Sequence, residues 1–244
     1  TYDGYQLTIE LPKEYKKGET YTLYLKYTAR PEKVKDKGSI AITAAKGLYF
    51  INSIGSDPNK PTQIWTQGET EANSCWFPTI DSPNQKTSQE IYITVPNKFK
   101  TLSNGVLVSQ ENSGSNRTDY WKFDQKHAPY LFFMGVGEYE VIEDSYKNIP
   151  VNYYVEKKYA SVAKDIFGLT PEMIGFFEDR LGVAYPWGKY SQIVAREYVS
   201  GAMENTTAVV HGDDAYQMKG QLIDENRQEN TIAHEIFHHW FGNL

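Results

Sequence analysis

Apolar and polar residues alternate with a period of two through the first 140 or so residues of the chain. The alternation is clearest in residues 5–9, 21–27 and 91–95. Such a pattern predicts antiparallel strands with one buried face. The dipeptide Asn104-Gly105 lies between two short apolar runs, and it predicts a tight hairpin turn. We therefore expect this part of the chain to form a β-rich saddle or sandwich.

Helical spacing replaces the alternation after about residue 146. Apolar side chains recur three or four positions apart at Tyr159, Val162, Ala163, Ile166 and Phe167. Thr170-Pro171 then predicts the N-cap and first turn of a second helix, which Gly182 would end. Short strands are expected at residues 191–195 and 207–210. The change of pattern predicts two domains in a multi-domain α+β chain, residues 1–139 and 140–244.

Composition excludes several classes of protein. Hydrophobic residues make up 40% of the 244 residues, and no run approaches the roughly 20 apolar residues of a membrane-spanning helix, so neither disorder nor a membrane span is expected. The 25 Lys and Arg against 31 Asp and Glu give a net charge of −6 without a basic block, so nucleic acid is not an expected partner. The single cysteine, Cys75, leaves both a cytoplasmic and a periplasmic or secreted location open.

The strongest chemical signal lies in residues 226–243. Asn226 and Glu229 have the spacing of a capping box, and Gly242-Asn243 has the chemistry of a helix end. Between them an apolar stripe runs through Ile232, Ala233, Ile236, Phe237, Trp240 and Phe241. These features predict a helix without reference to any motif.

Beside the stripe, His234, Glu235 and His238 form the pattern H-E-x-x-H. Four residues advance a helix by about 400°, so the two imidazoles differ by only about 40° in azimuth and can bind one zinc ion. The intervening Glu235 can then act as general base toward the attacking water. A helix with surface histidines is the alternative interpretation. His239 lies about 100° from His238 around the helix, so we expect it to pack or to support the site rather than to bind metal.

A second motif, Gly201-Ala202-Met203-Glu204-Asn205, ends 29 residues before His234. Taken alone, it could be a loop with a solvated Glu. Together, the two motifs resemble those of the gluzincin zinc aminopeptidase family, which includes aminopeptidase N, puromycin-sensitive aminopeptidase and the bifunctional leukotriene hydrolase. The resemblance implies that Gly201, Ala202, Met203, Glu204 and Asn205 bind substrate, with Glu204 holding its ammonium group.

A third segment, Thr66-Gln67-Gly68-Glu69, is similar to the part of the family's β domain that reaches over the active site. By resemblance, Gln67 and Glu69 help to bind the amino end of the substrate. A polar turn is the alternative interpretation. The resemblance covers the whole chain, and it implies an N-terminal β saddle followed by the start of a thermolysin-like catalytic domain.

The sequence departs from the family pattern at several positions. Many members carry an aromatic-Gly pair at the position of Thr206-Thr207, directly after the motif of residues 201–205, and Gln at the position of His239. Others carry Arg at the position of Asn73-Ser74 and Cys at that of Thr79. None of these departures removes a ligand or the base, so they bear on side-chain preference rather than on the chemistry.

In the family the third zinc ligand is a Glu nineteen positions after the second His, which lies beyond Leu244. We therefore expect a fragment, inactive alone, of a zinc-dependent aminopeptidase that removes single residues from peptides with free amino termini. A thermolysin-type endoprotease is the nearest alternative, and it should lack amine-binding carboxylates. A non-catalytic relative that serves as a protein-interaction scaffold is another, although such proteins usually lose a ligand or the base. Epoxide hydrolysis of the leukotriene type also stays open.

Overall fold

The computed structural model describes residues 1–35 and 38–244, which form three β-sheets and a set of helices. The first sheet is antiparallel, in the order β1 (Leu48–Ile51), β2 (Gln63–Thr66), β7 (Met134–Gly137) and β4 (Lys100–Ser103). The second is also antiparallel, in the order β3 (Thr87–Pro96), β6 (Asn116–His127) and β5 (Val106–Ser113).

The third sheet has five strands and contains the only parallel pairings among the described residues. Its order is β11 (Ala202–Met203), β12 (Ala208–Gly212), β10 (Tyr190–Ala195), β9 (Ile149–Glu156) and β8 (Tyr139–Tyr146). The central strand β10 runs parallel to both of its neighbours, whereas β11 and β8 pair antiparallel at the two edges. The chain passes from the first sheet to the third between β7 and β8.

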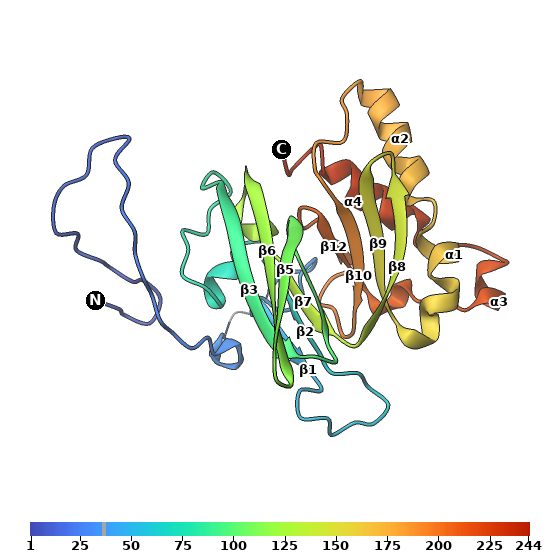
Figure 1. The fold of residues 1–244 in the computed structure, drawn as a ribbon, viewed down its shortest axis with the longest axis horizontal. Coiled ribbons are helices and arrows are strands. Elements are labelled where there is room, and N and C mark those ends of the chain that lie inside the picture. The colour runs from blue at the N-terminus through green and yellow to red at the C-terminus, as the bar shows by residue number, and fades with distance from the viewer. Residues whose placement is uncertain (36–37) are drawn as a thin grey trace.

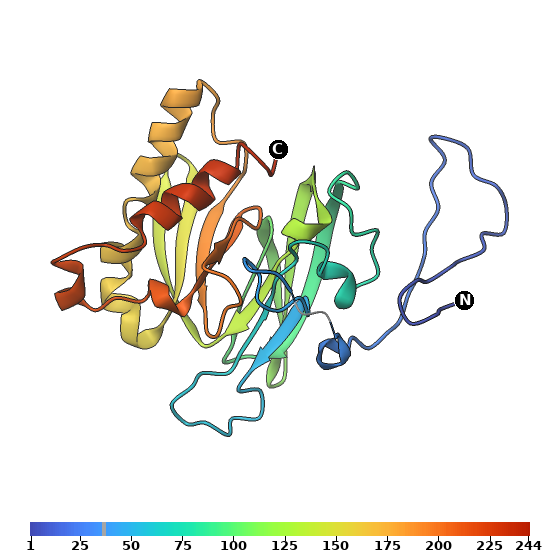
Figure 2. The same cartoon turned by 180° about the vertical axis from the view of Figure 1, so that it is seen from behind.

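The α-helices are α1 (Ala163–Phe167), α2 (Thr170–Leu181), α3 (Lys219–Leu222) and α4 (Glu229–His238). Short 3₁₀ turns are η1 (Pro31–Lys33), η2 (Asn73–Cys75), η3 (Pro129–Leu131), η4 (Lys157–Val162) and η5 (Asp213–Ala215). The helices lie on one side of the five-stranded sheet, and the other two sheets lie on its opposite side (Figures 1 and 2). None of the helices in the described part of the chain is long and apolar enough to cross a bilayer.

Two hydrophobic cores fill these layers. One lies between the five-stranded sheet and the helices, and it includes Val151, Tyr153, Ile166, Ile174 and Ile236. The other joins the β-rich half to the opposite face of the same sheet, and it includes Trp65, Leu102, Phe133, Ile193 and Val210. All six residues of β10 are buried as a result, which is typical of a parallel strand covered on both faces. The expected fold class, a β-rich part followed by a mixed part, is confirmed.

Two strand predictions are wrong. Residues 5–9 and 21–27 form no strand ladder, and this segment contains one isolated bridge, between Tyr2 and Leu7. Their apolar side chains are exposed, with Tyr5 at 97% and Tyr24 at 87%, and the segment lies apart from the three layers (Figure 1). Alternation gives a strand one apolar face, but it supplies neither the neighbour for the hydrogen bonds nor the layer that covers that face.

Three turn and cap predictions are also wrong in detail. Asn104-Gly105 does not close a hairpin, because β4 pairs with β7 and β5 pairs with β6 in another sheet. Gly105 adopts a positive φ of 75°, as expected for this dipeptide, but the turn is a corner between two sheets. Leu169 rather than Thr170 is the N-cap of α2, and Gly182 ends that helix in the left-handed conformation. Gln228 is at the N-cap position of α4 and makes no side-chain cap bond, whereas the side-chain oxygen of Asn226 accepts from the Gln228 N–H, one residue before the Glu229 N–H that a capping box uses.

Candidate active site

Helix α4 carries the two predicted metal ligands. Its buried face contains Ile232 and Ile236, which are 1% and 0% exposed, so the opposite histidine face is turned outward. The Nε2 atoms of His234 and His238 lie 3.0 Å apart. The spacing in the sequence therefore brings the two imidazole nitrogens to one point.

The geometry of this pair suits a single zinc ion. His238 Nδ1 lies 3.1 Å from the carbonyl oxygen of Phe241, which can accept a hydrogen bond from the Nδ1 proton. With the proton on Nδ1, the lone pair of Nε2 is available for a metal. Two ligands at 2.0–2.1 Å from a tetrahedral ion are about 3.4 Å apart, close to the observed separation. No group of three His, Cys, Asp or Glu side chains that could hold a metal occurs within residues 1–35 and 38–244. The described residues thus bring together the two predicted ligands, His234 and His238.

Glu235 lies between these histidines in the sequence but faces inward, with 5% of its surface exposed. Its Oε2 atom has no hydrogen-bond partner in the part of the chain that the structure describes. Burial raises the pKa of Glu235 to about 8, and the negative charges of Glu204 and Glu69 contribute to the increase. A carboxyl group of this kind can both accept and return a proton near neutral pH.

Glu69 and Glu204 come from different parts of the chain and approach the same space. Glu69 follows β2 and Glu204 follows β11, and both are half-buried. Burial raises the pKa of Glu69, and repulsion from Glu204 raises it further. The hydroxyl of Tyr130 lies 3.5 Å from Oε1 of Glu204. The structure therefore gathers carboxylates from both halves of the chain beside the histidine pair.

Gln67 connects the β-rich half to the motif of residues 201–205. Its Nε2 lies 3.3 Å from the sulfur of Met203, and its Oε1 accepts a hydrogen bond from the Tyr198 phenol. Gly201 is exposed, and Ala202 and Met203 form β11, which is the edge strand of its sheet. An edge strand has backbone groups available for an added strand, as a bound peptide requires.

The residues after Glu204 are deeply buried. Asn205 is 0% exposed, and its side-chain amide has no hydrogen-bond partner among the described residues. Thr207 is in contact with His239, because its backbone N–H donates to His239 Nε2 at 3.2 Å. Two of the departures from the family pattern are thus neighbours in space. His239 does not join the histidine pair, as expected from its azimuth, and its carbonyl accepts from the Trp187 indole.

Sequence reasoning missed three residues that contact the site. These are Tyr130 beside Glu204, Tyr198 on Gln67, and Asn243, which donates a 2.8 Å hydrogen bond to the carbonyl of Glu204. Tyr130 is 74 positions from Glu204, so no local pattern links the two. The sequence pattern indicates Asn243 only as part of a helix end, although its position close to the H-E-x-x-H motif is a signal for a polar contact with the site.

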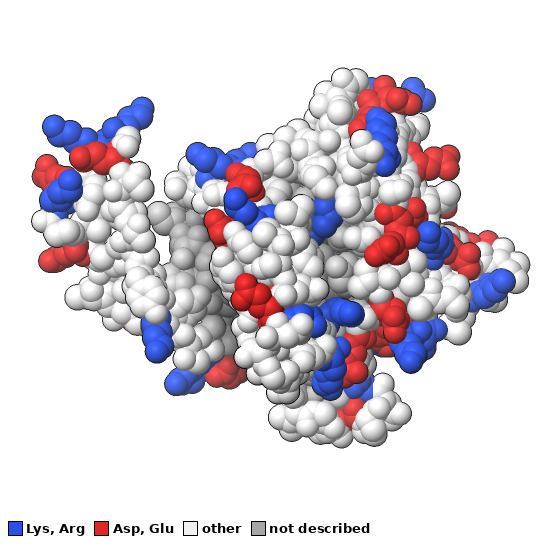
Figure 3. All heavy atoms as spheres, viewed as in Figure 1, with Lys and Arg blue, Asp and Glu red and all other residues white. Residues whose placement is uncertain are grey.

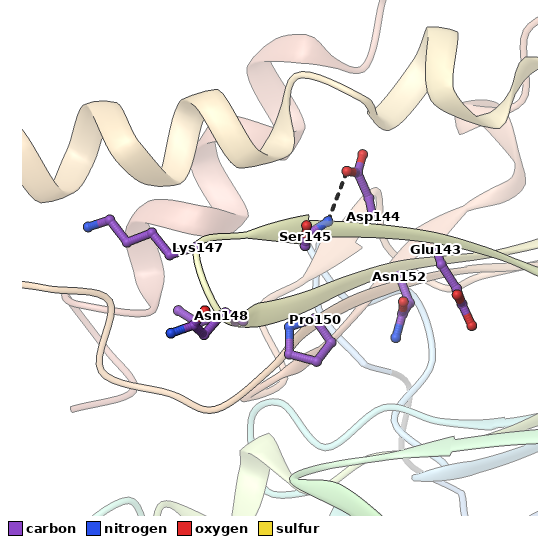
Figure 4. Close-up of a pocket in the computed structure, with 8 residues that line it drawn as sticks. Glu143, Asp144, Ser145, Lys147, Asn148, Pro150 and Asn152 are labelled. Carbon is purple, nitrogen blue, oxygen red and sulfur yellow. Dashed lines mark hydrogen bonds between the residues drawn. The ribbon is translucent and has the colours of Figure 1, made fainter.

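Other surface features contain none of the predicted site residues. A hollow of about 420 Å³ lies beside the turn between β8 and β9 (Figure 4). Its lining consists of Glu143, Asp144, Ser145, Lys147, Asn148, Ile149, Pro150 and Asn152. Acidic and basic side chains are intermixed on the face shown in Figure 3, without a continuous basic patch.

Comparison with known proteins gives two family matches. Residues 1–131 match the peptidase M1 N-terminal domain, and residues 166–244 match the peptidase family M1 domain. Similar proteins include glutamyl aminopeptidase of Bos taurus, at 28% identity over 81% of this chain and 21% of that protein. Tricorn protease-interacting factor F2 of Thermoplasma volcanium is 30% identical over 81% of this chain and 24% of its own. Probable aminopeptidase 1 of Saccharolobus solfataricus is 26% identical over 99% of this chain and 30% of its own. The chain spans about a quarter of the length of these relatives.

Proposed function

Because this chain belongs to the M1 peptidase family, we propose that the full-length protein containing it is a zinc-dependent aminopeptidase. Its substrates would be peptides with free amino termini, from which it removes one residue at a time. The observation that carries the proposal is the position of Glu69 and Glu204, two half-buried carboxylates beside the general-base candidate and the histidine pair.

His234 and His238 would hold the zinc ion, together with a ligand from outside the described residues. When bound, zinc supplies Lewis acidity that polarises the scissile carbonyl and acidifies water. Glu235 would accept the proton of the attacking water and deliver it to the leaving amine. The pKa of about 8 belongs to the site without a cation, and a nearby positive charge would lower it and favour the carboxylate.

The substrate would bind as a strand added along β11, with its ammonium group between Glu69 and Glu204. A free peptide amine has a pKa of about 7.7–8.0, so it is largely protonated near neutral pH. Half-buried carboxylates bind an ammonium group well because charge-assisted hydrogen bonds strengthen as water is excluded. The Tyr130 hydroxyl can help to fix the carboxylate of Glu204.

The two rival functions are less well supported by these residues. An endoprotease must accept a neutral peptide segment on the amino side of the scissile bond, where Glu69 and Glu204 would be left desolvated and unpaired. A non-catalytic scaffold has no requirement for both histidines and the base, and all three are present.

The decisive measurement is kcat/KM of the full-length enzyme for a peptide and its N-acetylated form. We expect a strong preference for the free amine, and Glu204→Ala should reduce that preference at least tenfold, about 1.4 kcal/mol. Glu138→Ala is the matched control, because Glu138 forms an exposed ion pair with Lys98. Equal cleavage of both peptides by the wild type would reject the aminopeptidase in favour of the endoprotease. An unchanged preference in Glu204→Ala would reject the amine-binding role.

A further inference from the structure

The loop that follows Glu204 is held by the β-rich half of the chain. The Asn104 amide donates a 2.7 Å hydrogen bond to the carbonyl of Thr206, and the Gly105 N–H donates at 2.7 Å to the hydroxyl of Thr207. His127 Nδ1 lies 3.1 Å from the Thr206 hydroxyl. Both threonines are buried, so these bonds are shielded from competing water.

Two residues at the end of the α4 segment hold the same loop from the other side: Asn243 donates to the carbonyl of Glu204, and His239 contacts Thr207. A backbone N–H can only donate, so the bond from Thr207 requires Nε2 of His239 to be the acceptor. The ring proton is therefore on Nδ1, which donates a 3.0 Å hydrogen bond to the carbonyl of Glu235. One imidazole thus connects the backbone of the general-base candidate to the loop that carries Glu204.

The imidazole of His239 has little freedom to move. It is 0% exposed, and it packs against Tyr185 and Tyr190 at centroid distances of 5.7 and 5.0 Å. Thr207 has a positive φ of 66°, which a β-branched residue adopts only when its surroundings enforce it. Its hydroxyl, its N–H and its carbonyl are all hydrogen-bonded, and His239 accepts the bond from the N–H.

We propose that His239 is a positioning residue that sets the distance between Glu204 and the histidine pair on α4. This inference rests on the proposed function, in which that distance determines how many substrate residues fit between the bound ammonium group and the scissile bond. Without the bond from Thr207, the loop would lose its link through His239 to the backbone of Glu235, and Asn243 would be its remaining contact with the end of the α4 segment. The ammonium group would then be held at variable distances from the reacting carbonyl.

The test uses the full-length, zinc-loaded enzyme and the same pair of free and acetylated peptides. His239→Leu should lower the preference for the free amine about tenfold or more, chiefly by raising KM for that substrate. His239→Gln provides an amide oxygen that can accept from Thr207, so it should restore the preference to within about threefold of the wild type. Zinc content should be unchanged in both variants.

His211→Leu is the matched control. His211 is also 0% exposed and forms one side-chain hydrogen bond, to Gln192 at 2.9 Å, but that bond does not involve the Glu204 loop. His211→Leu should lower the stability of the protein without changing the preference for the free amine. If His239→Leu does not fold, His239→Phe keeps an aromatic ring against Tyr185 and Tyr190 and removes both ring nitrogens, and the same loss is expected.

The outcomes separate the two proposals. A wild type without preference for the free amine overturns the proposed function itself. If the wild type prefers the free amine and His239→Leu or His239→Phe keeps that preference, the positioning role alone is overturned. An equal loss in His211→Leu, or no rescue by His239→Gln, also overturns it, because the effect would then be one of general stability.

Discussion

The side-chain nitrogen of Lys189 donates a 2.7 Å hydrogen bond to the carbonyl oxygen of Ser103, across the boundary between the two halves of the chain. Lys189 precedes β10, and Ser103 ends β4. The lysine is 5% exposed, and its nitrogen lies 4.5 Å from the ring centroid of Trp121. Burial lowers the pKa of Lys189 well below its ordinary value, because the ammonium group loses its hydration.

We expect Lys189→Met to match or exceed the stability of the wild type at pH 7, by up to about 1 kcal/mol, since it replaces a buried, desolvated amine with an apolar side chain of similar shape. Between the lowered folded pKa and 10.5 the unfolded state binds the extra proton, so wild-type stability rises with pH in that window. The advantage of the variant should therefore shrink as pH rises. Melting temperatures at several pH values test this, with exposed Lys98→Met as control. A variant that is clearly less stable at pH 7 would contradict it.

Asp119→Ala should destabilise the protein by about 3–5 kcal/mol. Asp119 is 1% exposed and accepts hydrogen bonds from Arg117, Thr101 and Gln110, so its loss leaves the Arg117 guanidinium buried without its partner. Burial alone would raise the pKa of Asp119, but these hydrogen bonds together outweigh it and hold the pKa below 3.8. The stabilisation is therefore present above that pH and lost as pH falls through the lowered value. Urea unfolding measures the loss, and the exposed Asp124→Ala should cost little.

Glu235→Gln in the full-length enzyme should keep zinc and lose turnover. Glutamine has nearly the same shape as glutamate, and Glu235 is not one of the proposed ligands, so zinc should stay bound. The amide cannot accept the proton of water, so kcat should fall about 10²–10⁴-fold. Metal analysis and kcat are measured on one preparation. A variant with normal zinc content and near-normal kcat would show that another group is the base.

A sample of residues 1–244 should bind zinc weakly and show no turnover. The described residues contain two converging imidazoles, whereas protein zinc sites normally take at least three protein ligands. Calorimetric titration and an aminoacyl-anilide assay check the two expectations. One zinc bound at nanomolar affinity, or chelator-sensitive turnover, would disprove them.

The sequence predicts the site better than it predicts the N-terminal fold. His234, Glu235 and His238 are close in sequence, and helix geometry alone determines their relative positions. The motif of residues 201–205 predicts the role of Glu204. It carries no information about how Glu204 approaches Glu69, which follows a strand of another sheet. Contacts such as that between Tyr130 and Glu204 depend on how the sheets pack, and no local pattern reports this.

The errors have a common physical origin. Residues 5–9 alternate as a strand should, but alternation describes one chain segment and not its neighbours. Asn104-Gly105 has the backbone chemistry of a hairpin, and the same positive φ serves equally well at a corner between sheets. Asn226 has the chemistry of an N-cap, but the N-cap position of α4 is Gln228, two residues later, and the Asn226 side chain binds the Gln228 N–H and the Ile166 carbonyl.

The parallel pairing of β10 has a consequence for the order of folding. Parallel neighbours cannot be joined by a tight turn, so β9 and β10 meet only after α1 and α2 have crossed between them. Such long-range pairings form slowly, because much chain entropy is lost before any contact compensates for it. β11 adds to this sheet only through β12, which itself needs β10 as a template. During refolding, we expect the backbone amides of β11 to become protected from hydrogen exchange later than those of the β8–β9 hairpin.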